Sequence, residues 1–129
     1  MNFHSIKKIK YWIQASRIET LPLSISGIIL GSFFAFYNYS FDKVIFILSI
    51  ITAISFQILS NFANDYGDGV LGTDNNRIGP KRVIASGKLT LKELKKGITV
   101  NVFVSITLSY ILIKYSFKND YLFILIFLF

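Results

Sequence analysis

Cysteine is absent from the sequence, and histidine occurs only once, at His4. The chain therefore cannot form a disulfide, a thiolate metal site, a histidine cluster or a Ser/His/Asp triad. Any metal that it binds must be held by oxygen ligands. Charged residues are also scarce, because they make up 16% of the 129 residues, whereas 53% are hydrophobic and 16% are aromatic. This composition is typical of a protein that lies in lipid.

Three long stretches contain no charged residue at all: 20–41, 44–64 and 97–113. Each is close to the ~20 residues that a helix needs to cross a bilayer. A fourth stretch is apolar from Tyr121 to Phe129. The first stretch is too long for a signal peptide, and no small-residue cleavage site follows it. We therefore predict an all-α, polytopic helical membrane protein with three complete spans, at about 20–41, 44–64 and 97–115, and an incomplete fourth at 121–129.

Most basic residues lie on one side of these predicted spans. Eleven of the 14 Lys and Arg residues either precede the first span or lie between the second and the third. By the positive-inside rule, the N-terminus and the loop 64–96 then face the cytoplasm, and the protein is expected in the cytoplasmic membrane. Topology accounts for most of the net charge of +7. We therefore expect the lipid bilayer, and not a nucleic acid, as the partner of the basic residues.

The loop after the second span carries a cluster of oxygen-bearing side chains. If the helix continues past this span, four such residues fall within an arc of about 100°: Asn61, Asn64, Asp65 and Asp68. Three glycines then disfavour further helix: Gly67, Gly69 and Gly72. The turn that they allow would bring Asp74 back beside Asp68. The sequence thus predicts acidic residues gathered at a membrane surface.

These side chains suit a hard divalent cation, and they are followed closely by basic residues. Magnesium takes one or two carboxylates and completes its octahedron with water and substrate phosphate. Calcium is less suited, because the EF-hand pattern is absent. Cations at Arg77, Lys81 and Arg82 could neutralise phosphate oxygens that a metal does not reach. Further on, Thr90 and Glu93 match a capping box that begins the next helix.

Solvated loop charges are the alternative interpretation of this cluster. Asp and Gly are common in turns, and Lys and Arg follow membrane topology. That interpretation explains the basic residues well. It does not explain why acids gather at the end of an apolar helix, where polar groups are costly and usually functional.

The same residues resemble those of the UbiA-type membrane prenyltransferases, and more narrowly the branch that prenylates 1,4-dihydroxy-2-naphthoate. The common motif of the superfamily, N-x-x-x-D-x-x-x-D, fits Asn64 and Asp68 but meets Gly72 at its third position. The naphthoate branch has N-x-x-x-D-x-x-x-x-x-D, which Asn64, Asp68 and Asp74 satisfy. The segments 17–22 and 77–87 are similar to this branch as well. The resemblance is specific over residues 17–97.

The resemblance implies that the chain is the N-terminal portion, 1–129, of a single UbiA-type domain that transfers a polyprenyl group from polyprenyl diphosphate to dihydroxynaphthoate in menaquinone biosynthesis. Magnesium would be the cofactor, with Asp68 and Asp74 as its main ligands, Asn64 in support and Asp65 as either a ligand or an outer acceptor. Arg77, Lys81 and Arg82 would clamp the diphosphate. Together these are the expected catalytic, metal-binding and substrate-binding residues.

Family members also have later helices and a second aspartate-rich loop, which this sequence does not contain. We therefore expect the 129-residue chain alone to be inactive and poorly stable in a membrane. One alternative is a prenyltransferase for another aromatic acceptor, such as 4-hydroxybenzoate, although the spacing of Asp74 argues against it. Another is a truncated membrane protein that performs no chemistry.

Overall fold

The computed structural model describes residues 3–73, 82–117 and 125. Every regular element within this part of the chain is helical: α1 (Phe3–Ser16), the short 3-10 helix η1 (Ile18–Thr20), α2 (Leu21–Tyr37), α3 (Lys43–Leu71) and α4 (Leu91–Phe117). Three helical stretches are long and apolar enough to cross a membrane: Lys7–Tyr37, Lys43–Leu71 and Leu91–Phe117. The predicted all-α membrane fold with three complete spans is thereby confirmed. Of the predicted fourth span, only Leu125 belongs to the described residues.

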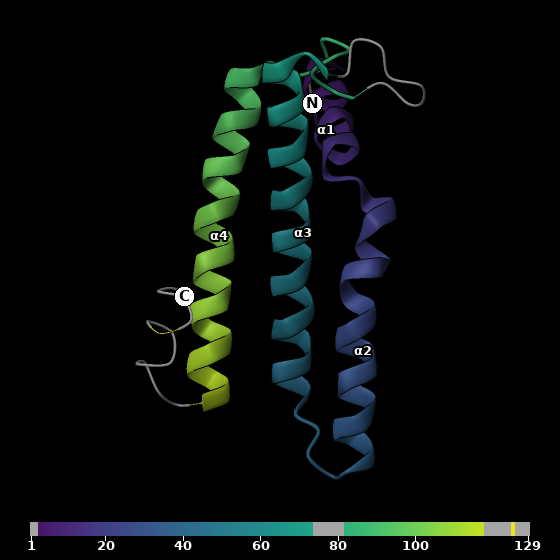
Figure 1. Cartoon of the computed structure of the whole chain (residues 1–129), viewed down its shortest axis with the longest axis vertical. Helices are drawn as coiled ribbons and strands as arrows, with labels where there is room; N and C mark the ends of the chain where they lie inside the picture. The colour runs from purple at the N-terminus through teal and green to yellow at the C-terminus, as the bar shows by residue number, and fades with distance from the viewer. Residues whose placement is uncertain (1–2, 74–81, 118–124, 126–129) are drawn as a thin grey trace.

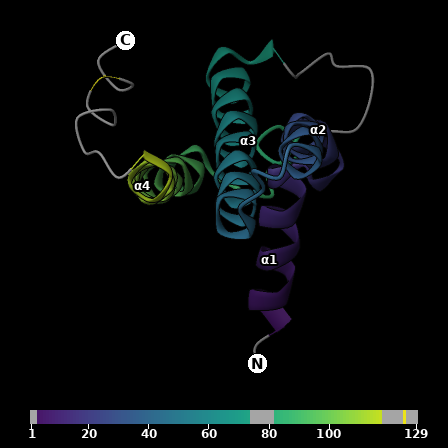
Figure 2. The same ribbon diagram turned by 90° about the horizontal axis from the view of Figure 1, so that it is seen from below.

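Helices α2, α3 and α4 lie side by side with α3 in the middle, whereas α1 runs across one end of the bundle (Figures 1 and 2). We call this end, which holds α1, the end of α3 and the start of α4, the charged end. Its core consists of five buried residues: Ala15, Phe62, Val83, Leu89 and Leu94. Towards the other end, large apolar side chains such as Leu23, Phe33 and Phe36 of α2 are exposed. Such a surface suits contact with lipid or with further helices.

Local hydrogen bonds explain where the helices begin. The carboxylate of Asp42 caps α3 by accepting from the backbone N–H of Val44 at 2.7 Å and of Ile45 at 3.0 Å. The predicted capping box is also present, because Thr90 Oγ1 accepts from Glu93 N at 3.2 Å and Glu93 Oε2 accepts from Thr90 N at 3.0 Å. These caps satisfy N–H groups that no helical carbonyl can reach.

The expectation that three glycines would disfavour the helix after Asp65 was wrong for two of them. Helix α3 continues through Gly67 and Gly69 and ends only at Leu71, where Gly72 adopts the left-handed conformation with φ 68°. A glycine inside a helix costs only about 1 kcal/mol relative to alanine, so tertiary packing can outweigh it. At Gly69 the packing partner is Ile84, whose Cγ2 lies 2.6 Å from where a Cβ would be.

Polar side chains join α3 to α4 inside the apolar region. Ser55 Oγ lies 2.7 Å from Ser105 Oγ and donates to Asn101 Oδ1 at 3.0 Å, while Asn101 Nδ2 donates to the carbonyl of Ser55 at 3.3 Å. In lipid, an apolar side chain gains no hydrophobic free energy when it leaves the lipid tails for another helix. Such hydrogen bonds and close packing therefore determine which helix faces meet.

Replacing Asn101 by leucine is therefore expected to weaken the pairing of α3 and α4 by about 1 kcal/mol, because two interhelical hydrogen bonds are lost. The free energy of unfolding in detergent micelles measures the change. Phe103→Leu on the exposed side of the same helix is the matched control, and its unfolding should match that of the original chain. Equal unfolding free energies for Asn101→Leu and the control would contradict this role.

Candidate functional site

The acidic side chains of α3 lie on its last turns, at the charged end. Because the helix is regular as far as Leu71, Asn61, Asp65 and Asp68 follow one another along one side of it. Their exposure increases along the helix. Asn61 and Asp65 are buried, with 3% and 2% of their surface exposed, whereas the side chain of Asp68 is 31% exposed. The site therefore extends from the protein interior to the surface.

Asn61 holds the corner between α1 and α2. Its Nδ2 donates to the carbonyl of Ser16 at 2.9 Å and to Thr20 Oγ1 at 3.0 Å. We expected Asn61 to join the acids in one ligand arc, but in the structure its amide group is bonded to this corner. The difference arises because a buried amide must satisfy its hydrogen bonds, and the nearest partners are on the preceding helices.

Asp65 is the most buried acidic residue in the described part of the site, and it forms an ion pair with Arg17. Arg17 belongs to the same corner, between α1 and η1, and has the left-handed backbone conformation with φ 46° and ψ 64°. A non-glycine residue rarely adopts this conformation unless surrounding contacts hold it. The corner thus directs a guanidinium towards the buried carboxylate.

Arg82 joins the two acids. Its Nη1 is hydrogen-bonded to Asp68 Oδ2 and lies 3.4 Å from Asp65 Oδ1. The other oxygen of Asp68 accepts from Thr73 Oγ1 at 2.9 Å. Arg82 reaches this position because the segment 82–90 packs on the end of α3, where Gly69 leaves room for Ile84. A carboxylate and a guanidinium therefore meet at the surface.

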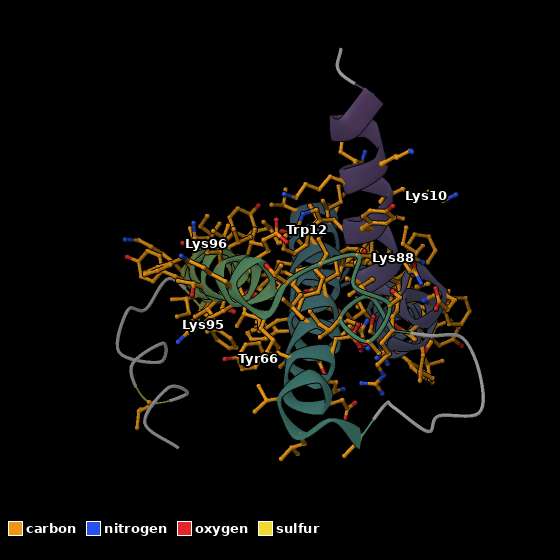
Figure 3. The ribbon with its side chains drawn as sticks, turned by 90° about the horizontal axis from the view of Figure 1, so that it is seen from above. Lys10, Trp12, Tyr66, Lys88, Lys95 and Lys96 are labelled. Carbon is orange, nitrogen blue, oxygen red and sulfur yellow. The ribbon has the colours of Figure 1, made fainter. Side chains whose placement is uncertain are left out.

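Basic side chains surround this end of the molecule. Figure 3 looks onto it from above, and Lys10, Lys95 and Lys96 point outward at its edge, whereas Trp12 lies among the helices. Between α1, α3 and α4 is a pocket of about 540 Å³, with apolar walls that include Ile58, Phe62 and Val104. An ion pair between Lys8 and Glu93 links α1 to α4 beside it. An anionic, lipid-like molecule would find both charge and apolar surface here.

The structure thus brings together part of the predicted site. Asp65, Asp68 and Arg82 meet, and Asn64 is exposed on the same turns of α3. The other predicted site residues, Asp74, Arg77 and Lys81, lie outside the described residues. Within the described part of the chain, no three acidic, His or Cys side chains form a group that could hold a metal.

The donors that are present nevertheless fit magnesium in chemical type. Asn64 and Asp68 are hard oxygen donors four residues apart on one helix, and both are accessible. Asp65 fits less well, because its Oδ1 already contacts two guanidinium groups. A cation held by Asn64 and Asp68 would need phosphate, water or another carboxylate to complete its shell.

Sequence reasoning missed the role of Arg17 in the site. Membrane topology accounts for the basic residues that precede the first span, and Arg17 is one of them. Its partner, Asp65, lies 48 residues away in the sequence. The available signal was the pair Asn61 and Asp65, four residues apart on a largely apolar helix. Residues at this spacing face the same neighbour, and buried polar groups need hydrogen-bonding partners, so a polar or charged partner was to be expected on one neighbouring element.

Comparisons with known proteins agree with the resemblance. A model of the UbiA prenyltransferase family matches residues 24–129. The chain is 42% identical over 103 residues to the 1,4-dihydroxy-2-naphthoate octaprenyltransferase of Escherichia coli (strain K12), covering 79% of this chain and 33% of the relative. It is 39% identical over 116 residues to the protein of the same name from Haemophilus influenzae (strain ATCC 51907 / DSM 11121 / KW20 / Rd), covering 88% and 38%. The chain thus spans about a third of the length of these relatives. No solved structure matches it significantly.

The packing of Gly69 leads to a prediction about the segment that carries Arg82. A methyl group at Gly69 would overlap Ile84, which is branched at Cβ and cannot easily move aside, so Gly69→Ala should destabilise the protein by about 1–3 kcal/mol. Gly67→Ala is the matched control, because nothing lies within 4 Å of a Cβ there. It should be neutral or stabilising by up to about 1 kcal/mol. Thermal unfolding in detergent, followed by Trp12 fluorescence, measures both; equal changes would contradict the close packing.

Proposed function

Because the chain belongs to the UbiA prenyltransferase family, we propose that the full-length protein transfers a polyprenyl group from polyprenyl diphosphate to 1,4-dihydroxy-2-naphthoate in menaquinone biosynthesis. The observation that carries this proposal is the meeting of Asp68 with Arg82 at the end of a membrane-spanning helix. A carboxylate can hold a metal ion on a diphosphate, and a guanidinium can bind the phosphate oxygens directly. The names of the relatives support the choice of acceptor.

The proposed donor site combines described and undescribed residues. Asn64, Asp68 and Asp74 would hold magnesium, while Arg77, Lys81 and Arg82 would bind the diphosphate. Support for Asp68 comes from its partial exposure and from its position beside Arg82. The donor's long apolar tail would lie between helices or in lipid, and the apolar pocket at this end is one place that could receive part of it. This requirement explains why such a reaction takes place in a membrane.

In the proposed reaction, the bond between the first prenyl carbon and the diphosphate oxygen breaks, and its electron pair stays on the diphosphate. Bound magnesium would neutralise part of the charge that develops on this leaving group. Arg82 would contribute in the same way, because a fixed guanidinium stabilises the developing charge more strongly than the neutral ground-state ester oxygen. The electron-rich ring of the acceptor then forms the new bond to carbon, and net loss of the ring carboxylate as carbon dioxide restores the aromatic ring.

We further propose that the charged end faces the cytoplasm and that the protein resides in the cytoplasmic membrane. The basic residues of α1 and of the start of α4 lie at this end, and the positive-inside rule places such residues on the cytoplasmic side. A water-soluble diphosphate product could then leave directly into the cytoplasm.

The acceptor is tested with membranes from cells that make the full-length gene product. Incubation with polyprenyl diphosphate, magnesium and either dihydroxynaphthoate or 4-hydroxybenzoate should give a prenylated product only from dihydroxynaphthoate, as detected by mass spectrometry. Membranes from cells without the gene are the control. Prenylation of 4-hydroxybenzoate alone would overturn the naphthoate assignment while leaving the reaction class intact.

Asp68→Asn tests the donor site in the same assay. The change keeps the size of the side chain but removes the charge, so magnesium-dependent turnover should fall at least about 100-fold. Asp42→Asn at the other end of α3 is the matched control, because asparagine also caps helices well and should leave turnover intact. Both variants should insert into the membrane in normal amounts. Unchanged turnover for Asp68→Asn would show that Asp68 is a surface charge with no role in the donor site.

A further inference from the structure

Four charged side chains form an alternating series at the charged end: Arg17, Asp65, Arg82 and Asp68. Exposure differs sharply within the series. The side chain of Asp65 is 3% exposed and that of Arg82 14% exposed, whereas Asp68 at the end of the series is 31% exposed. The proposed donor would therefore meet Asp68 and Arg82, while Asp65 lies behind them.

Both arginines approach the same oxygen of Asp65. Arg17 Nη2 forms the hydrogen bond to Asp65 Oδ1, and Arg82 Nη1 is 3.4 Å from that oxygen, beyond the usual hydrogen-bond range. The same Nη1 instead forms its hydrogen bond with Asp68 Oδ2. Arg17 thus occupies the position that Arg82 would take if Asp65 were its main partner.

The corner that carries Arg17 is fixed independently of this ion pair. Asn61 donates hydrogen bonds to the carbonyl of Ser16 and the hydroxyl of Thr20, on either side of Arg17. The left-handed backbone of Arg17 is thereby held in place. The guanidinium can consequently remain on Asp65 while other partners of the site change.

We propose that Arg17 is a positioning residue for the donor site, and that it acts through Asp65. A buried carboxylate requires a positive partner. By supplying this partner, Arg17 prevents Asp65 from drawing Arg82 inward and leaves Arg82 beside Asp68, where the diphosphate binds. Asp65 is then an internal acceptor and not a magnesium ligand. This inference rests on the proposed function, because it needs a diphosphate donor at Asp68 and Arg82.

The test measures donor binding without the acceptor, so that it does not depend on the naphthoate assignment. The full-length gene product in lipid nanodiscs is titrated with an unreactive thiolodiphosphate analogue of a prenyl donor in the presence of magnesium. Arg17→Gln should weaken binding about 10-fold or more, the effect of one charge-assisted hydrogen bond lost when Arg82 turns to Asp65. In turnover assays, the KM for the donor should rise and kcat should fall as well, because Arg82 would also stabilise the charge that develops on the diphosphate.

Removal of the competing carboxylate should reverse the effect. Arg17→Gln combined with Asp65→Asn should restore binding to within about 3-fold of the original protein, since the carboxylate of Asp65 then no longer competes with Asp68 for Arg82. Asp65→Asn alone should also retain magnesium-dependent binding. It provides the decisive comparison if Arg17→Gln does not fold.

A purely structural effect is separated by a variant that weakens the fold far from the site. Asp42→Ala removes the cap of α3 at the other end of this helix, so it should lower the unfolding temperature but leave donor affinity per folded protein unchanged. The proposal is overturned if folded Arg17→Gln binds the analogue like the original protein, or if Asp65→Asn does not restore it. Loss of magnesium-dependent binding in Asp65→Asn alone would overturn it as well. If the original protein binds the donor analogue but does not prenylate dihydroxynaphthoate, only the choice of acceptor fails.

Discussion

The charged end is organised around one costly group, the buried carboxylate of Asp65. A carboxylate that is almost fully removed from water must be paired and hydrogen-bonded. Arg17 meets this requirement from the corner between α1 and α2, and Arg82 contributes from the segment that precedes α4. Two parts of the chain that are distant from each other in sequence are therefore tied to the last turns of α3. The geometry of the proposed donor site follows from this requirement.

Polar contacts have the same role along the rest of the bundle. The exposed apolar faces of α2, α3 and α4 give no preference for one neighbour over another in lipid, because lipid tails are equally apolar. Asn61 therefore selects the α1–α2 corner, and Ser55 selects the face of α4 that carries Asn101 and Ser105. A few such hydrogen bonds are enough, because each of these polar groups would cost free energy if it lay away from water without a partner.

The sequence was sufficient for features that depend on local or summed properties. Charge-free stretches predicted the three spans, and the spacing of Thr90 and Glu93 predicted the start of α4. The sequence was insufficient where two physical effects act on the same residue and only the folded structure shows which one prevails. Helix propensity alone suggested an end near Gly67, but packing at Gly69 keeps the helix intact. Membrane topology already explained the charge of Arg17, so nothing local indicated that this side chain turns inward to Asp65.

The pairing of Asp68 with Arg82 also has a consequence for how a donor would bind. Each carboxylate and guanidinium that meets the donor is already partly neutralised by the other, so binding would exchange one set of charged partners for another. The net free energy of such an exchange is smaller than the sum of the new contacts. A site of this kind can contact a highly charged diphosphate at many points and still release it after the carbon–oxygen bond has broken. A firmly held Arg17 would keep the rest of the cluster in place during that exchange, because its own partner does not change.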